Sequence, residues 1–380
     1  MGEERPSSAA EVAEALRSAA RSGRSVRPRG GGTKLGWGRP TTEPDVELSL
    51  SAWDRIVEHN AADLTAVLQA GARLSDVQQI LATAGQMLAL DPPEGTSTIG
   101  GIVATGDSGP LRHRYRAVRD LLLGITVALA DGSVATAGGK VIKNVAGYDL
   151  MKLFAGSFGT LGVILEVAVR LHPLPPERVT AAGTTGDPEA IQRAASAVTH
   201  APLEAEAVDV DWADGSGSLL VRLAGAAPGP RARAAVDLIA AEGVPADLVE
   251  EDDALWDRQR ARQRSAQATV VRVSGRQSAL ARMIDAAARS GGALVARAGS
   301  GLAWVELPPD DLAATAGRIE DVRRDLAPFP CVILDAPAEV RAKVDPWDIE
   351  DGPELRLMRR LKERFDPAHI LNPGLFVGGI

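Results

Sequence analysis

Two residue types that build redox and metal centres are scarce in this sequence. Among its 380 residues there is one cysteine, Cys331, and there are five histidines. A single thiol cannot form an internal disulfide, ligate an iron–sulfur cluster or build a cysteine-based zinc site, which fits a reducing compartment. The histidines are dispersed along the sequence without a pattern of acidic partners, so we expect no divalent metal site.

An excess of basic residues and a long apolar N-terminal run are also missing. The 42 lysine and arginine residues are outnumbered by 50 aspartate and glutamate residues, which gives a net charge of -8 and a pI near 5.3. Such a chain lacks the charge needed to neutralise the phosphates of a nucleic acid. Residues 1–23 resemble neither a signal peptide nor a transmembrane helix. We expect a soluble cytoplasmic protein; peripheral membrane attachment through a partner remains open.

Glycine, by contrast, is abundant, with 39 residues. Four glycine-bearing turns lie within residues 91–173: Gly100-Gly101, Gly106 to Gly109, Gly138-Gly139, and Gly159 with Gly162. Apolar residues alternate from Leu161 to Leu171, which is the period of a strand with one buried face. Asp131-Gly132 indicates a type I′ hairpin turn. Because glycine at strand ends lets amide N–H groups approach a ligand, we expect these turns to hold a dinucleotide.

A second glycine cluster follows a short strand that begins at Val26: Arg29, Gly30, Gly31, Gly32 and Thr33. Three successive glycines offer no side chain for packing. We interpret them as a tight loop whose amides, with the Thr33 hydroxyl, face phosphate oxygens. A flexible surface turn is the alternative, and the glycines downstream favour the first interpretation. The pattern is neither a P-loop nor a Rossmann G-x-G-x-x-G, and Lys34 is expected to be solvated.

Capping boxes mark two helices in the first part of the chain. Ser8 to Glu11 reads S-x-x-E and Ser75 to Gln78 reads S-x-x-Q. Around them the sequence divides into two small α/β units, residues 24–90 and 91–175. We expect the cofactor to lie between these units, with both glycine clusters facing it.

Beyond Pro173 the composition changes. Residues 173–190 are rich in proline, glycine and threonine and are interpreted as a linker into a new domain. From Ala268 onward the elements alternate as β-α-β-β-α-β, the ferredoxin-like unit, and the preceding segment looks like a partial copy. Two such halves would form one antiparallel sheet with helices on one face. Pro353 opens a C-terminal helix that we expect to dock onto the body.

Five motifs, in order, resemble the FAD-linked oxidases of the vanillyl-alcohol oxidase/PCMH type: RGGGTKLGWG, GTSTIGGIVATGDSG, VRDLLLG, GYDLMKLFAGSFGTLGVILEV and FDPAHILNPG. The resemblance implies an α+β fold. Its expected parts are an N-terminal helix at 1–23, a PCMH-type FAD-binding domain at 24–175 with lobes 24–90 and 91–175, a ferredoxin-like cap domain at 176–340, and a C-terminal helix and tail at 341–380 that return to the FAD domain.

The resemblance also implies which residues bind FAD. The first pyrophosphate loop would be Arg29, Gly30, Gly31, Gly32 and Thr33, and the second Thr98, Gly100 and Gly101. The strip along the ribityl chain and isoalloxazine would be Ala104, Gly106 and Ser108. The segment beside the adenosine and flavin would be Gly159, Gly162, Val163 and Ile164, and the residue returning towards the ring would be Asn372. Thr98 as a turn cap and Asn372 as a turn former are the alternatives.

Covalent attachment of flavin in this family uses a histidine in the first loop, often with a later cysteine. The first loop here contains no histidine, and Cys331 lies in the expected cap. The resemblance therefore implies FAD that is held non-covalently, by phosphate–amide hydrogen bonds and burial of the ring.

Within the family the nearest resemblance is to the FAD-binding E subunits of glycolate oxidase, through AGQMLALDPP, GPLRHR, VIKNVAGYDL and GSGLAWVEL. It implies a subunit that oxidises glycolate to glyoxylate together with a catalytic flavoprotein subunit and an iron–sulfur subunit, in the cytoplasm or at a membrane through those partners. A stand-alone FAD-dependent 2-hydroxy acid dehydrogenase is the alternative.

The catalytic residues are not identified by this resemblance. The H-x-G-D-G-N-x-H-type metal cluster of the catalytic relatives is absent from the sequence. His113, in a basic stretch after the flavin strip, is a candidate to face the isoalloxazine or bind an anion, although a solvated basic loop is the favoured interpretation. Tyr148 is expected in the core and Lys143 on the surface.

Overall fold

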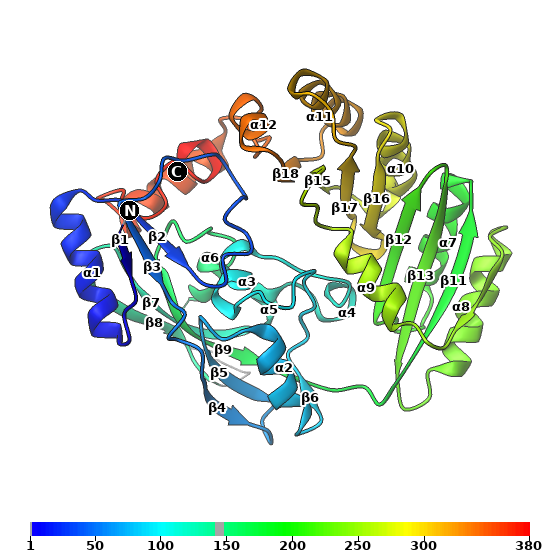
Figure 1. Ribbon diagram of the computed structural model, residues 1–380. Coiled ribbons are helices and arrows are strands. Elements are labelled where there is room, and N and C mark those ends of the chain that lie inside the picture. The colour runs from blue at the N-terminus through cyan, green and yellow to red at the C-terminus, as the bar shows by residue number, and fades with distance from the viewer. Residues whose placement is uncertain (1, 141–147) are drawn as a thin grey trace.

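The computed structural model describes residues 2–140 and 148–380. An N-terminal body of short strands and helices lies beside a second body built on one large sheet, and the C-terminal helices return to the first body (Figure 1). No helix among the described residues is long and apolar enough to cross a membrane.

Two sheets organise the N-terminal body. A parallel sheet has the order β1-β3-β2, and an antiparallel five-stranded sheet has the order β4-β5-β9-β7-β8. The bounds are β1 Gly2–Glu4, β2 Val26–Arg29, β3 Val46–Ser49, β4 Ile56–Asn60, β5 Thr65–Gln69, β7 Leu122–Ala128, β8 Val134–Gly138 and β9 Val163–Arg170. A short ladder pairs β6 Gln86–Met87 with β10 His172–Pro173. The alternation predicted for β9 is confirmed, since its odd-numbered apolar side chains are buried.

The hairpin predicted at Asp131-Gly132 is confirmed, because β7 and β8 pair as antiparallel neighbours. The type I′ geometry predicted for its turn is wrong. Type I′ needs positive φ at both central residues, whereas Gly132 has a φ of 76° and Asp131 does not share that conformation. The core position predicted for Tyr148 is also wrong, since 88% of the residue is exposed. Lys143 lies outside the described residues.

The helices of this body are α1 Ala9–Ser22, α2 Leu74–Ala82, α3 Ile99–Thr105, α4 Arg112–Tyr115, α5 Val118–Leu121 and α6 Met151–Phe154. The predicted cap of α1 is confirmed, because the Ser8 side chain accepts a hydrogen bond from the Glu11 N–H. The box predicted at Ser75 is wrong, since α2 begins after Arg73 without a side-chain cap. Thr98 caps α3, so the two following glycines lie in a helical first turn and not in a turn at a strand end.

The second body is an antiparallel sheet of order β14-β11-β13-β12-β16-β17-β15-β18. Its strands are β11 Glu177–Thr185, β12 Ala207–Ala213, β13 Ser216–Gly225, β14 Ala246–Val249, β15 Thr269–Ser274, β16 Ala293–Arg297, β17 Leu302–Leu307 and β18 Cys331–Asp335. Its helices are α7 Pro188–His200, α8 Gly229–Ala241, α9 Asp253–Ala261, α10 Leu280–Arg289 and α11 Leu312–Leu326. All of these helices except α9 pack on one face and form a common core with the sheet.

The β-α-β-β-α-β order predicted from Ala268 is confirmed, and the preceding segment is a complete second copy, from β11 to β14. The linker interpretation of residues 173–190 is therefore wrong for most of that segment. β11 is a nine-residue strand that pairs with both β13 and β14, and α7 starts at Pro188 behind an Asp187 cap. Its threonines, glycine and flanking prolines resemble a turn sequence, but the pairing on both edges favours a strand.

The C-terminal segment contains α12 Ala338–Lys343 and α13 Pro353–Phe365. It returns to the first body as predicted: Val26 N–H donates to the Ile370 carbonyl at 2.7 Å, and Asn372 N–H donates to the Val26 carbonyl at 3.0 Å. Inside this junction the buried Lys362 pairs with Asp366 at 2.7 Å. Lys362 Nζ also donates to the Thr160 carbonyl at 2.9 Å, and this bond, with those at Val26, fixes the tail against the first body.

Candidate functional site

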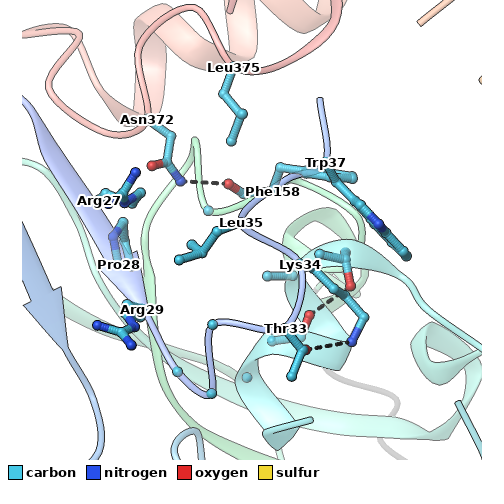
Figure 2. A pocket seen from close by; sticks show the side chains of 18 of the residues that line it. Arg27, Pro28, Arg29, Thr33, Lys34, Leu35, Trp37, Phe158, Asn372 and Leu375 are labelled. Atoms are coloured by element: carbon cyan, nitrogen blue, oxygen red, sulfur yellow. Dashed lines mark hydrogen bonds between the residues drawn. The ribbon is translucent and has the colours of Figure 1, made fainter. Parts of the chain in front are cut away.

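A cavity of about 310 Å³ lies between the N-terminal body, α12 and the C-terminal tail. Figure 2 shows side chains from β2, the loop after it, α3 and the tail around this space. Most of the residues predicted to bind FAD line it: Arg29, Gly30, Gly31, Gly32, Thr33, Thr98, Gly100, Gly101, Ala104, Gly159, Gly162, Ile164 and Asn372. Three predicted residues do not. Gly106 is the left-handed C-cap of α3, Ser108 is buried beyond it, and Val163 is buried in the core.

The two glycine segments touch one another at the wall of this cavity. A Cβ on Gly30 would lie 2.1 Å from Thr98 Oγ1, and a Cβ on Gly31 would lie 2.9 Å from the Thr96 carbonyl oxygen. Both distances are too short for a side chain. Glycine is therefore required here by the close approach of the two segments, which lets them form one continuous surface.

The first segment offers backbone donors that the protein does not use. No hydrogen bond within the described part of the chain takes up the N–H groups of Gly30, Gly31 or Gly32. Gly32 adopts a φ of 74°, which glycine tolerates and which reverses the chain. Successive free amides around a concave turn attract anions. The Gly100 amide, in contrast, already donates to the Ala70 carbonyl at 2.7 Å, so this glycine serves close packing.

Lys34 is not solvated, and that prediction is wrong. Its side chain is 5% exposed and lies 3.1 Å from the Asp107 carboxylate. Its Nζ also donates to Ser97 Oγ at 2.7 Å and to Thr33 Oγ1 at 3.2 Å. The lysine therefore links the first loop to the second and holds them at a fixed separation.

The remaining wall is largely apolar and comes from distant parts of the chain. Leu35, Trp37, Phe158 and Leu375 project around it in Figure 2. Asn372 Nδ2 donates to the Phe158 carbonyl at 2.8 Å, so its amide orients the loop before β9. A polar, amide-rich end joined to an apolar section fits a dinucleotide that carries an aromatic ring system.

Next to this cavity, the face of the large sheet opposite its main helices carries polar groups beside a cluster of apolar side chains. Arg297 is fully buried and pairs with Asp209 at 2.5 Å, yet its Nε and Nη2 find no hydrogen-bond partner among the described residues. On the same face, in β15 and separated from β16 by β17, lies Arg272, for which the described part of the chain provides no counter-ion. The closest candidate, Asp107, is already paired with Lys34. Sequence reasoning missed this face because strand alternation gave no sign that its polar side would be covered.

Two residues from the first body complete this polar region. Arg112, on α4, also lacks a side-chain partner among the described residues, and burial lowers its pKa and that of Arg272. Asp91 lies beside Arg260, and burial, only partly offset by nearby arginines, raises its pKa to about 7. The region therefore holds more buried positive charge than it neutralises, which favours an anionic ligand.

His113 and Cys331 lie away from the cavity. His113 packs against the backbone of Gly299 and lines a separate groove, so it does not face the predicted ring site. Cys331 is buried in β18, where burial raises the pKa of its thiol to about 12. Among the described residues no group of three or more histidine, cysteine, aspartate or glutamate side chains could hold a metal ion.

Comparison with known proteins adds a family assignment to this geometry. The family model described as an FAD binding domain matches residues 4–138, and that of the FAD linked oxidases, C-terminal domain, matches residues 348–375. An uncharacterized FAD-linked oxidoreductase of Mycobacterium tuberculosis is 28% identical over 98% of this chain and 90% of its own length. The glycolate oxidase subunit GlcE of Escherichia coli is 37% identical over 39% of this chain and 42% of its own length.

The fold is also that of a solved enzyme. An alkyldihydroxyacetonephosphate synthase structure superposes with a TM-score of 0.71 at 16% identity, covering 98% of this chain and 76% of that one. The expected α+β architecture, an FAD-binding domain with a second α/β domain and a returning C-terminal segment, is confirmed. The expected cofactor is confirmed as well, because the matched domain binds FAD.

Proposed function

The chain is an FAD-linked oxidoreductase, and from that premise we propose that it is the FAD-binding subunit of a glycolate oxidase or dehydrogenase complex. In this complex it would act on the CH–OH group of glycolate together with a catalytic flavoprotein subunit and an iron–sulfur subunit. The proposed complex is cytoplasmic and attaches to a membrane only through its partners. The 37% identity to GlcE over 39% of this chain is the observation that carries this proposal.

Within this proposal FAD is held non-covalently. The free amides of Gly30, Gly31 and Gly32 would hold the diphosphate, and the apolar wall with Phe158 would enclose the ring. The lining of the cavity, as far as the chain is described, contains no histidine or cysteine side chain that could form a bond to flavin. When bound, FAD supplies the two-electron acceptor for oxidation of an alcohol.

A second candidate is a stand-alone FAD-dependent 2-hydroxy acid dehydrogenase, and the polar sheet face favours it. Arg272 and Arg112 are half-buried beside the cavity, and the described residues provide neither with a counter-ion. A guanidinium group binds a carboxylate through two parallel hydrogen bonds. In this role the two arginines would bind the carboxylate of the hydroxy acid and orient its carbinol carbon towards the ring. A chain that only relays electrons has no need of such a site.

One experiment separates the candidates. The purified FAD-loaded chain, without partners, is mixed anaerobically with glycolate or D-lactate and flavin bleaching is followed. If the chain acts only within a complex, reduction requires the partner subunits. If it acts alone, reduction proceeds without partners. Arg272→Met should then lower the rate constant of flavin reduction divided by the substrate Kd about 100-fold, the loss expected for one charge-assisted bidentate contact. Arg276→Met, an exposed arginine just beyond the same strand, is the control and should leave the rate unchanged.

A further inference from the structure

The segment after the first glycine loop is held by the second body as well as by its own. The Thr33 carbonyl accepts a hydrogen bond from Arg264 Nη2 at 3.1 Å. Four residues further on, Trp37 is 2% exposed and its Nε1 donates to Asp335 at 3.0 Å. Both partners lie in the second body, at the end of the α9 segment and in β18. The free amides of the loop therefore precede an anchor that another domain provides.

A further contact continues the same anchor. The Gly38 carbonyl accepts a hydrogen bond from Arg341 Nη1 at 3.0 Å, and Arg39 pairs with Asp345 at 2.7 Å. A Cβ on Gly38 would lie 2.8 Å from the Leu375 carbonyl oxygen, so the segment also fits closely against the C-terminal tail. The loop is thus attached to the rest of the chain on the side away from β2.

Arg264 lies at the centre of these contacts. Its guanidinium donates to both carboxylate oxygens of Asp335, at 2.7 and 2.9 Å, and stacks 5.0 Å from the centre of the Trp37 ring. Its Nη1 lies 2.9 Å from Glu94, an ion pair without hydrogen-bond alignment. Glu94 precedes the second glycine segment. This one side chain, which is 17% exposed, therefore contacts the sheet of the second body and the residues next to both glycine segments.

The planarity of the guanidinium explains why these contacts act together. Its donors have fixed directions, so a rotation that satisfies Asp335 also fixes the bond to the Thr33 carbonyl. If the second body shifted, the Thr33 carbonyl would lose this bond, and the end of the three glycines would be held only by the side-chain contacts of Thr33 and Lys34 with Ser97 and Asp107. Lysine could keep the charge but not the simultaneous geometry.

We propose that Arg264 is a positioning residue that couples FAD binding to docking of the second body on the first. With the arginine bond in place, the amides of Gly30 to Gly32 are held ready for the diphosphate. By thermodynamic linkage, FAD binding then strengthens docking of the second body by the same factor. This inference depends on FAD binding and not on the identity of the substrate, so failure of the glycolate proposal would leave it standing.

The test measures the dissociation constant of FAD by fluorescence quenching on the apoprotein. Arg264→Met removes the carbonyl bond and the ion pairs at similar side-chain length, and should raise Kd about 10- to 100-fold, the effect of losing a charge-assisted hydrogen bond. The Kd of Arg264→Lys for FAD should lie between those of Arg264→Met and the wild type. Arg262→Met is the matched control, because Arg262 pairs with Asp211 inside the second body at similar exposure; it should stay within about 2-fold.

A second readout separates coupling from general stability. Hydrogen exchange at Trp37 and Gly38 is measured with and without FAD; the protection that FAD gives these amides should be lost in Arg264→Met and kept in Arg262→Met. If Arg264→Met does not fold, Arg264→Lys and Trp37→Phe, which removes the bond to Asp335, carry the same comparison. An FAD affinity that is unchanged in the folded Arg264 variants, or that falls equally in Arg262→Met, would overturn the proposal.

Discussion

Substitution of Gly31 by valine tests the contact between the two glycine segments. A Cβ at this position would lie 2.9 Å from the Thr96 carbonyl oxygen, and the two extra methyl groups of valine make the contact worse. The clash is with backbone, which cannot rotate aside. The first segment must therefore move away from the second, and its free amides move with it.

The expected effect follows from the number of hydrogen bonds at risk. Three successive N–H groups, from Gly30 to Gly32, are available to a diphosphate. A hydrogen bond to a charged group contributes about 1.5 to 3 kcal/mol, so displacement of two of them costs about 3 to 6 kcal/mol. The dissociation constant of FAD should rise about 10²- to 10⁴-fold. The reason is displacement of the donors, because the structure directs the new side chain at Thr96 and not into the diphosphate position.

Titration of the apoprotein with FAD, followed by fluorescence quenching, measures this loss. Gly36→Ala is the matched control in the same loop, since a Cβ there meets nothing within 4 Å; its affinity should stay within about 2-fold. Circular dichroism checks that both variants are folded. If folded Gly31→Val bound stoichiometric FAD with the affinity of the control, the reasoning about this loop would be refuted.

Two further predictions concern buried charges. Lys362→Met should lower the free energy of unfolding by about 3 to 5 kcal/mol in urea titrations, because it leaves the buried Asp366 without its cation. The control, Arg364→Met at an exposed position, should lower it by less than about 0.5 kcal/mol. Equal losses in both variants would contradict this account of the C-terminal junction. Asp91, whose pKa burial raises to about 7, favours the folded state below pH 4, and this contribution is lost as pH rises towards 7. Asp91→Asn should therefore gain stability over the wild type between pH 4 and pH 8, by at most about 4 kcal/mol; a difference that does not vary with pH would count against a raised pKa.

Local signals in the sequence predicted the elements that depend on few residues. The strand β9 followed from its alternation, α1 from the capping box at Ser8, and the start of the returning C-terminal helix from Pro353. These predictions succeeded because backbone preference and burial favour the same local structure. The glycines at residues 30–32 were predicted to face phosphate because they carry no side chains for packing; they line the cavity, and FAD binding by them stays a prediction.

Features that depend on distant partners were not predictable in the same way. Lys34 reads as a surface lysine, and only the folded chain brings Asp107 and Ser97 to it. The strand β11 resembles a turn sequence until β13 and β14 pair with it. Helix α3 was missed for a related reason: two glycines disfavour a helix, but the Thr98 cap and close packing on Ala70 outweigh that preference.

The polar sheet face shows the same limit for the site. Arg272 and Arg297 stand at alternate strand positions that a sequence reading assigns to solvent. In the folded chain Arg297 is fully buried and Arg272 is half-buried, so two arginines expected at the surface become shielded charges beside a cavity. Their significance depends on the packing of one body against the other, which no local pattern encodes.

The crystal structure of this chain with FAD bound tests the central claim most directly. We predict a diphosphate within hydrogen-bond distance of the amides of Gly30, Gly31 and Gly32, in the cavity that Gly101 also lines, with the isoalloxazine ring on the side of Phe158 and Leu375. A diphosphate bound elsewhere, with these amides facing solvent, would contradict the account.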